Sequence, residues 1–351
     1  MPQFTLSVPG DFEKLGERWR ALEAEADASF FQSWTWVGCE VAARFPDPIL
    51  IEATLGGETM ALALCNRIAG WSGDTLWLGE SGLPAWDSLF VEHNGPLVAA
   101  TAAPDVIRGL LKTGLGRLGR RLVLSGVRGG IATAARMIPG TLELHPDRPS
   151  PCVDFNRLRA TASDHAASLS ANTRQQIRRS LRRYQTNGPI VMRRAADVPE
   201  ALACLDGLVL LHQETWRRRN RQGAFAVPEF YRFHRALIAR AIPRREAELL
   251  HFSAGGQTIG YLYNFLWRGW VLAYQSGFAY PHADPRRKPG LTCHHLAIEA
   301  HMAEGMNGYD FLAGEARYKT SFTNSQNSLS WLELGPVWRP ASIEAWLRRM
   351  W

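Results

Sequence analysis

Residues 248–276, ELLHFSAGGQTIGYLYNFLWRGWVLAYQS, decide the fold of the C-terminal half. Aromatic and β-branched residues dominate three short segments, which glycine interrupts, so the stretch predicts three consecutive strands. Gly255-Gly256 supplies the positive φ angles that a two-residue hairpin turn needs. We therefore expect an antiparallel meander here, with strands at 248–254, 257–266 and 269–276.

The same order of elements is expected earlier in the chain. Gly56-Gly57 precedes Glu-Thr-Met much as Gly255-Gly256 precedes Gln-Thr-Ile. Each hairpin is followed by a third strand, a polar loop, a helix and another strand, at a spacing of about 200 residues. We infer an internal duplication with a join within 150–165. The other helices are expected near 11–27, 33–45, 103–117, 171–186, 197–218, 228–241 and 291–304, and the other strands near 48–54, 59–67, 73–79, 121–126 and 309–312.

The duplication predicts an α/β (α+β) protein of two domains, at 1–157 and 158–351. With 46% hydrophobic and 21% charged residues, the 351-residue chain can fill two cores. No signal peptide pattern and no run of about 18 apolar residues occurs, so we expect a cytoplasmic protein that is soluble or peripheral to the inner membrane. The five scattered cysteines lack CxxC spacing and are expected to be reduced core residues.

A basic loop follows the meander and opens a helix. Residues 284–292, DPRRKPGLT, place three cations and a glycine at the predicted N-terminus of that helix. A helix N-terminus offers unpaired N–H groups and the positive end of a dipole, which together suit a phosphate. An ordinary solvated loop can have the same composition. The candidate phosphate ligands are Arg286, Arg287, Lys288, Gly290, Leu291 and Thr292.

Local sequences of the second half resemble a known family. They are SANTR (170–174), LHQETW (211–216), KPGL (288–291) and above all YDFLAGEARYK (309–319), which resembles a DFLxGxxxYK signature. The second half resembles the GNAT (acyl-CoA N-acyltransferase) superfamily, in particular its CelD-like branch, which is related to FemAB-type transferases and bacterial ceramide synthases. The first half resembles it more weakly. The resemblance implies two tandem GNAT-like domains, each with a mixed, mostly antiparallel sheet flanked by helices.

The resemblance also implies an activity. An acyl group would pass from acyl-CoA, acetyl-CoA or longer, to an amine of a sugar, lipid or amino-acid-like acceptor in cell-envelope, exopolysaccharide or sphingolipid biosynthesis. The domain at 158–351 would hold the acyl-CoA, and the domain at 1–157 would be structural or face the acceptor. In this family the third strand of the meander ends beside the thioester, which points to Tyr274, Gln275 and Ser276.

The resemblance assigns catalytic roles residue by residue. Asp310 or Glu315 would be the general base, and Tyr318 would protonate the leaving thiolate. Lys319 would bind a phosphate or carboxylate, and Gln275 would help to polarise the thioester carbonyl. A strand-end carboxylate and a core aromatic residue are equally good readings of Asp310 and Tyr318.

Acceptor contacts are expected in two places. His212 and Trp216 are four residues apart on a predicted helix and therefore face the same way. A packed aromatic pair is the simpler interpretation of these two. Glu80, Trp86 and Asp87 fall in an irregular loop after a strand, where binding residues concentrate.

Two basic or amphipathic segments leave alternatives open. Residues 165–196 contain seven arginines and no acid, and their helix would expose the arginines of 174–183. That face could bind tRNA in a FemX-type aminoacyl transferase, coenzyme A, anionic lipid or other nucleic acid, or could simply be solvated. Few aromatic residues are interleaved, which disfavours nucleic acid.

Apolar residues at 343, 346, 347 and 350 predict an amphipathic helix that docks on its own domain or attaches to an anionic membrane.

Two further patterns are set aside. His294, His295 and His301 share a predicted helix but lack HExxH spacing and a nearby carboxylate triad, so no metal is expected. The GxGxxG at 114–119 follows a helix and precedes a strand, which is the reverse of a dinucleotide-binding context.

The expected partners are a small-molecule or lipid acceptor, and the sequence leaves the oligomeric state open.

Overall fold

The chain forms two compact units in the computed structural model, Met1–Arg148 with the stretch that begins at Ser328, and Pro149–Asn327. The described residues are 1–70, 73–83, 86–87, 91–116, 120–161, 164–281, 284–314 and 317–335, without the side chains of Arg317 and Tyr318. The amphipathic helix predicted at 343–350 lies outside them. In the described part, no helix combines the length and the apolar character needed to cross a bilayer.

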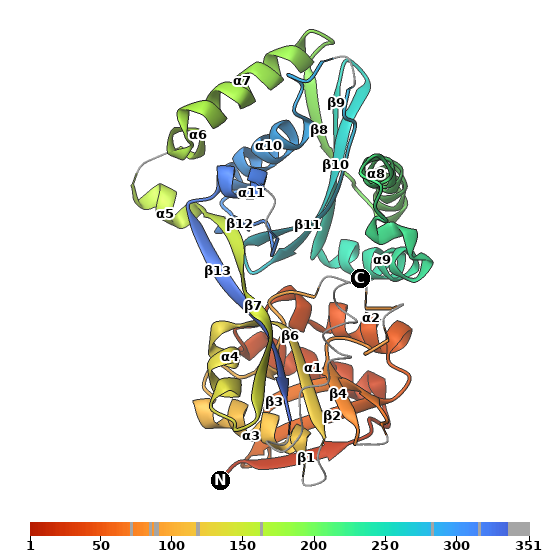
Figure 1. Cartoon of the computed structure of the whole chain (residues 1–351), viewed down its shortest axis with the longest axis vertical. Helices are drawn as coiled ribbons and strands as arrows, with labels where there is room; N and C mark the ends of the chain where they lie inside the picture. The colour runs from red at the N-terminus through yellow and green to blue at the C-terminus, as the bar shows by residue number, and fades with distance from the viewer. Residues whose placement is uncertain are drawn as a thin grey trace. The chain divides into compact units, whose positions relative to one another are not determined.

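Unit 1 is a sheet with strand order β1-β2-β3-β4-β6-β13, in which β5 also pairs with β3 (Figure 1). The predicted Gly-Gly turn joins β2 to β3 with φ angles of +61° and +88°. β4 is antiparallel to β3 and parallel to β6. The elements are β1 (Gln3–Ser7), α1 (Phe12–Glu25), η1 (Phe30–Gln32), α2 (Trp34–Arg44), β2 (Pro48–Leu55), β3 (Glu58–Ile68), β4 (Thr75–Leu78), β5 (Leu97–Val98), α3 (Pro104–Leu115), β6 (Arg121–Arg128), α4 (Gly129–Arg136) and β13 (Ser325–Leu334).

Unit 2 repeats this arrangement in the order β7-β12-β11-β10-β9-β8. Its Gly-Gly turn joins β9 to β10 with φ angles of +54° and +78°. β11 is antiparallel to β10 and parallel to β12. The elements are β7 (Thr141–Asp154), α5 (Phe155–Ala160), α6 (His165–Ser168), α7 (Ala171–Gln185), β8 (Ile190–Arg194), α8 (Val198–Arg218), η2 (Ala224–Ala226), α9 (Pro228–Ala241), η3 (Ile242–Arg244), β9 (Ala247–Ala254), β10 (Gln257–Trp267), β11 (Trp270–Phe278), α10 (Pro289–Ala303), β12 (Gly308–Asp310) and α11 (Arg317–Phe322).

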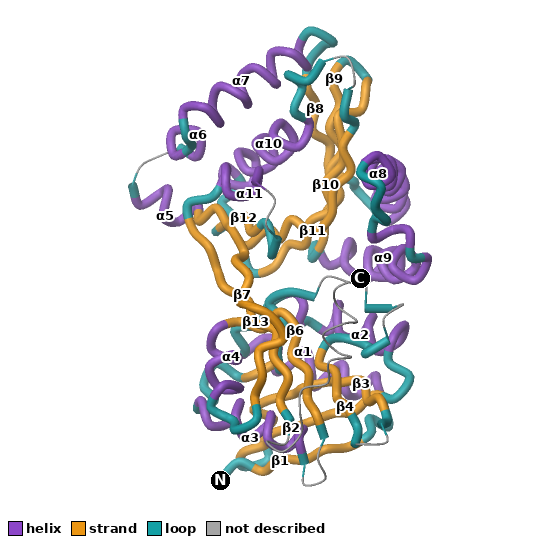
Figure 2. Tube along the Cα trace, viewed as in Figure 1, coloured by secondary structure: helices purple, strands orange, loops and turns teal. Residues whose placement is uncertain are grey.

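The sheet of each unit buries alternate residues against helices. In unit 1, Ala61, Ala63 and Cys65 of β3 share a core with residues of α3, as the two-residue period of a strand requires. In unit 2, α7 and α10 cover one face of the sheet and α8 and α9 the other (Figure 1). Ile177 of α7 and Ile298 of α10 are buried in the core that this sheet forms. Figure 2 shows helices and sheet strands together in each unit.

The domain boundary expected at 157/158 differs from the division in the structure. Residue Cys152 of β7 already pairs with Asp310 of β12, so unit 2 begins before α5. At the other end, the chain returns to unit 1, where Leu329 pairs with Arg128 of β6. The order of elements in the sequence contains no sign of this return, because β13 completes a sheet whose other strands lie about 200 residues or more earlier.

Candidate functional site

The parallel strands β11 and β12 pair for only three residues, 270–272 with Gly308–Asp310. β11 continues to Phe278, and its register against β10 shifts so that Tyr274 is the extra residue of a bulge. In the described part of the chain, no strand pairs with 273–278 on the side of β12. Backbone groups along this edge are therefore placed to bind a ligand.

The three residues expected beside the thioester lie on this edge. The ring of Tyr274 is buried, with its centroid 4.7 Å from that of Phe265 and 5.1 Å from that of His234. The side chains of Gln275 and Ser276 are half-buried. Tyr274 thus contributes a core aromatic ring, and the backbone N–H groups of this segment remain suited to contact a carbonyl oxygen.

Helix α10 starts at Pro289, two residues before the expected start, because proline is well tolerated in the first turn. No described side chain caps the first turn at Lys288. A Cβ atom on Gly290 would lie 3.3 Å from the Phe278 ring, which is a tight contact. The N–H groups of Gly290 and Leu291 lie in this uncapped first turn, as the phosphate-site prediction requires.

A buried hydroxyl pair fixes this turn to α7. Ser180 Oγ accepts a hydrogen bond from the Lys288 N–H at 2.8 Å and lies 2.8 Å from Thr292 Oγ1. Both hydroxyl side chains are fully buried. Thr292, which was expected to contact phosphate, therefore anchors the helix from inside.

The three cations of the loop differ in their surroundings. Arg287 is half-buried, donates to Asn187 Oδ1 at 2.9 Å and stacks over Tyr184 with 5.4 Å to the ring centroid. Arg286 and Lys288 are exposed. These two lie within three residues of the uncapped turn and are the cations available to an anion there.

A pocket of about 250 Å³ lies beside the same loop. Its walls come from the end of α7, from α8, from the β9–β10 hairpin and from the segment after β11. Burial raises the pKa of the Tyr184 hydroxyl, which stays neutral at physiological pH. The lining includes Tyr184, Asn187, Leu211, Glu214, Arg218, Tyr280 and Arg287. The sequence did not predict the pocket, since its walls meet only through the fold.

The loop after β12 is braced from two sides. The Asp310 carboxylate is 2% exposed and accepts from Ser150 Oγ and from the Leu312 N–H, each at 2.7 Å. Leu312 has a φ of +60°, a conformation that is costly for leucine. Lys319 Nζ donates to the carbonyls of Leu312 and Ala313 at 3.1 and 2.8 Å.

These contacts give Asp310 and Lys319 a structural part in the signature loop. A general base needs a lone pair that reaches the substrate, and the Asp310 oxygens face the protein interior. The catalytic roles expected for the two residues stay predictions. Glu315 and the side chain of Tyr318 lie outside the described residues.

His212 and Trp216 form the packed pair. Trp216 Nε1 donates to His212 Nε2 at 2.9 Å, and the His212 ring centroid is 5.2 Å from that of Phe225. A Cβ atom on Gly223 would lie 2.8 Å from atoms of both rings, so only glycine fits there. Burial lowers the pKa of His212 to about 4, so the imidazole is neutral at physiological pH. Acceptor contact by this pair stays a prediction.

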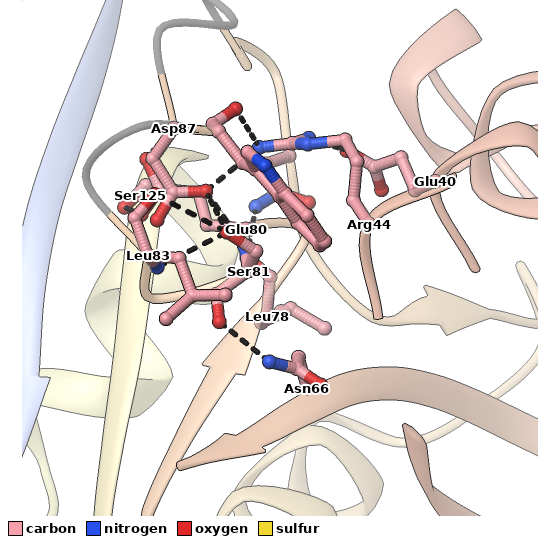
Figure 3. Close-up of polar contacts among 11 residues, drawn as sticks. Glu40, Arg44, Asn66, Leu78, Glu80, Ser81, Leu83, Asp87 and Ser125 are labelled. Atoms are coloured by element: carbon pink, nitrogen blue, oxygen red, sulfur yellow. Dashed lines mark hydrogen bonds and ion pairs between the residues drawn. The ribbon is translucent and has the colours of Figure 1, made fainter. Parts of the chain in front are cut away.

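In unit 1, the loop after β4 is held by an internal polar network (Figure 3). Asp87 Oδ1 accepts from Arg44 Nη2 and from the Ser81 N–H and hydroxyl, each at 2.7 Å. Arg44 also donates to the carbonyl oxygen of Trp86 at 2.9 Å. Ser125 Oγ donates to the Glu80 carboxylate at 2.6 Å.

This network lies where β4 and β6 stop pairing, the position that corresponds to the β11–β12 opening of unit 2. Arg44 additionally forms a buried ion pair of 3.0 Å with Glu40. Burial nevertheless raises the pKa of Glu40 to about 8, against the opposing effect of Arg44. The residues predicted here as acceptor contacts thus hydrogen-bond to other residues of unit 1, namely Arg44, Ser81 and Ser125, and acceptor binding in unit 1 stays a prediction.

Comparison with known proteins agrees with this geometry. Residues 171–320 match the family described as an acetyltransferase (GNAT) domain. That range contains the β11–β12 opening, the first turn of α10 and the residues that line the pocket. The match supports a transferase. No curated protein matches the chain in sequence.

Solved structures share the fold over nearly the full length. The crystal structure of FemX has a TM-score of 0.64 and 8% identity, covering 95% of this chain and 98% of FemX. The structure of L-PGS from Bacillus licheniformis has a TM-score of 0.55 and 11% identity, covering 95% of this chain and 96% of the other. The predicted architecture is confirmed: unit 2 contains the residues that match the GNAT domain, unit 1 repeats its strand order, and each unit has a mixed, mostly antiparallel sheet flanked by helices.

Proposed function

We propose that the protein is an acyl-CoA-dependent N-acyltransferase of the CelD-like branch, with its donor site in unit 2. The observation that carries the proposal is the uncapped first turn of α10 beside the open edge of β11. A phosphate-binding helix end and a strand edge with available backbone groups are the two features that a CoA thioester needs.

The donor would occupy three neighbouring places. Its pyrophosphate would bind the N–H groups of Gly290 and Leu291, with Arg286 and Lys288 supplying positive charge. Its adenosine would enter the pocket beside Tyr184 and Arg287. Its pantetheine arm would follow the edge of β11 at 273–278 and bring the thioester to the bulge.

The reaction would be attack of a neutral amine on the thioester carbon. The C–N bond forms, the C–S bond breaks, and the carbonyl oxygen carries negative charge in between, which backbone N–H groups at Gln275 and Ser276 would stabilise. The proton lost by the amine would go to Glu315 and the thiolate would be protonated by Tyr318, in keeping with the resemblance of 309–319. We propose an amine of a sugar, lipid or amino-acid-like molecule of the cell envelope as acceptor, with sphingoid bases included.

Calorimetric titration of the purified protein with coenzyme A, acetyl-CoA and palmitoyl-CoA tests the donor. Coenzyme A should bind saturably to the unaltered protein. Gly290→Glu should weaken this binding, because the substitution adds bulk against Phe278 and a negative charge at the pyrophosphate. We expect at least about tenfold weaker binding, about 1.4 kcal/mol. The matched control is Gly130→Glu, because Gly130 is also the second residue of a helix, α4, and has open space around it. Equal CoA affinity in both variants would contradict the donor site.

A second candidate is favoured by the outer face of α7. Arg178, Arg179 and Arg182 are exposed, and none of them forms an ion pair within the described part of the chain. A row of unpaired arginines suits a polyanion, such as the tRNA of a FemX-type aminoacyl transferase or another nucleic acid or anionic surface. Titration with tRNA in parallel separates the two. Tight tRNA binding that Arg178→Glu/Arg179→Glu abolishes, without any CoA binding, would support the second candidate.

A further inference from the structure

Three metal-ligating side chains converge between α6 and α10 in unit 2. His165 Nδ1, His295 Nδ1 and a Glu299 carboxylate oxygen all lie within 4.8 Å of one another. Glu299 Oε1 is 3.7 Å from His165 Nδ1 and 3.9 Å from His295 Nδ1. All three atoms are buried and have no hydrogen-bond partner in the described part of the chain. This trio is separate from the proposed donor site, and the inference does not depend on the proposed function.

The distances from Glu299 to the two histidines, and the tautomer of His165, indicate that these three groups suit a bridging cation. Separations of 3.7 and 3.9 Å are too long for hydrogen bonds. His165 Nε2 lies 2.9 Å from the Phe322 carbonyl oxygen, which can only accept, so Nε2 carries the proton. In the neutral imidazole, Nδ1 then presents a lone pair to the carboxylate. Two lone pairs buried face to face are unfavourable unless a proton or a metal cation lies between them.

The contact of the second His165 ring nitrogen is one that metal-ligating histidines usually make. A ligating histidine usually donates its other ring N–H to a carbonyl or carboxylate, which fixes the ring, and His165 does so to Phe322. The His165 side chain is fully buried and cannot turn to solvent. His295 and Glu299 are four residues apart on α10, so both face the same way.

We propose that His165, His295 and Glu299 bind one Zn²⁺ ion, with water as the fourth ligand. Two imidazoles and one carboxylate are a donor set that Zn²⁺ accepts. Tetrahedral Zn²⁺ with bonds of about 2.0–2.1 Å holds its donors about 3.4 Å apart, so a small side-chain adjustment closes the site. The Glu299 side chain is 41% exposed, which gives the ion and its water a route in.

The ion would have a structural effect. It would tie α6 to the middle of α10, the helix whose first turn forms the proposed phosphate site. Through His165 it would also hold the Phe322 carbonyl at the end of α11. Since an unfolded chain does not offer these three ligands together, binding would stabilise the folded state.

The test uses the full chain after removal of metal with a chelator. We expect one equivalent of Zn²⁺ to bind saturably and to raise Tm by several degrees at micromolar excess. Co²⁺ in place of Zn²⁺ should give visible absorption bands of a low-coordinate nitrogen and oxygen site. Glu299→Gln and His295→Gln should each weaken Zn²⁺ binding at least about tenfold and remove the Co²⁺ bands.

The control is Glu229→Gln, because Glu229 is a helical carboxylate of similar exposure, 37%, that pairs only at the surface with Arg232. It should bind Zn²⁺ as the unaltered protein does. His165→Asn is a third variant, but its loss of the Phe322 contact can impair folding, so the two α10 variants decide. Absence of one-equivalent binding, or unchanged affinity and spectrum in both α10 variants, would overturn the proposal.

Discussion

Lys319 donates hydrogen bonds to two carbonyls of the loop after β12. Two roles are open for this lysine of the 309–319 segment: it braces the loop, or it binds a phosphate of the donor. A brace loses stability when its hydrogen bonds are removed, whereas a phosphate ligand loses affinity. Lys319→Met should lower the free energy of unfolding by about 1–3 kcal/mol, because the Leu312 and Ala313 carbonyls lose a charged donor. Urea unfolding of the variant measures this cost.

Lys112→Met is the matched control for Lys319→Met, because Lys112 is an exposed lysine on α3 of unit 1. It should leave stability within about 0.5 kcal/mol of the original. If Lys319→Met unfolds like the control but binds coenzyme A less tightly, the phosphate role is correct and the bracing role is minor.

The buried imidazole of His212 gives a pH-dependent contribution to stability. Its pKa is lowered by burial to about 4 from an ordinary value of 6.5, so the unfolded state takes up a proton at higher pH than the folded state. Stability is therefore lost as pH falls from 6.5 to 4, by up to about 3 kcal/mol. His212→Gln keeps an acceptor for Trp216 Nε1 but does not titrate in this range.

The free energies of unfolding of both proteins at pH 7 and pH 4.5 check this prediction. The decrease between the two pH values should be smaller in His212→Gln than in the original protein. An equal decrease would contradict the lowered pKa of His212. It would mean that the folded protein protonates His212 as readily as the unfolded chain does, in spite of the packing against Phe225.

At the scale of elements, the contact between α7 and α10 rests on a hydroxyl pair. Ser180→Ala leaves the Lys288 N–H and the buried Thr292 hydroxyl without their partner, which should cost about 1–3 kcal/mol. It should also weaken CoA binding, since Lys288 begins the turn proposed to hold the pyrophosphate.

A double-mutant cycle with Thr292→Val tests whether the two hydroxyls act together. We expect the double variant to be more stable than the sum of the single effects predicts, by about 0.5–3 kcal/mol. In the double variant both hydroxyls are absent, so neither is left buried without a hydrogen-bond partner. Chemical unfolding of all four proteins gives the coupling energy. Additive effects would show that the α7–α10 contact depends on apolar packing around Ile177 instead.

The elements that the sequence predicted are those with a strong local signal. The Gly-Gly turns and the alternation on either side specified the β2–β3 and β9–β10 hairpins. Helix α10 was predicted two residues short, since Pro289 is compatible with both a loop and a first helical turn. β1, β7, β8 and β13 were not predicted, because each is an edge or closing strand whose pairing partner is set by the fold.

The site was predictable to a similar degree. The Pro-Gly loop indicated the first turn of α10, because the chemistry of a phosphate site is local in the sequence. No metal was expected from the sequence, because His294, His295 and His301 lack HExxH spacing and a nearby carboxylate triad. His295 and Glu299, four residues apart, were a usable signal, but His165 lies about 130 residues earlier and only the tertiary structure brings it there.

At the scale of the whole molecule, β13 assigns residues near the end of the chain to the first unit. Leu332 is fully buried in the core of unit 1, whereas the expected domain boundary would put it with 158–351. Leu332→Ala should destabilise unit 1 by about 2–5 kcal/mol. Hydrogen exchange read out by mass spectrometry should then show faster exchange in peptides from 48–68 and 121–128.

Leu262→Ala is the matched control in unit 2, because Leu262 is fully buried in the core of that unit. It should speed exchange in peptides from 247–278 and leave those of unit 1 protected. Each unit has its own core, so local opening should follow the core that was damaged. Faster exchange of 247–278 in Leu332→Ala, with 48–68 unchanged, would contradict the place of β13 in unit 1. Loss of protection in both units at once, in both variants, would show instead that the duplicated halves unfold as one cooperative body.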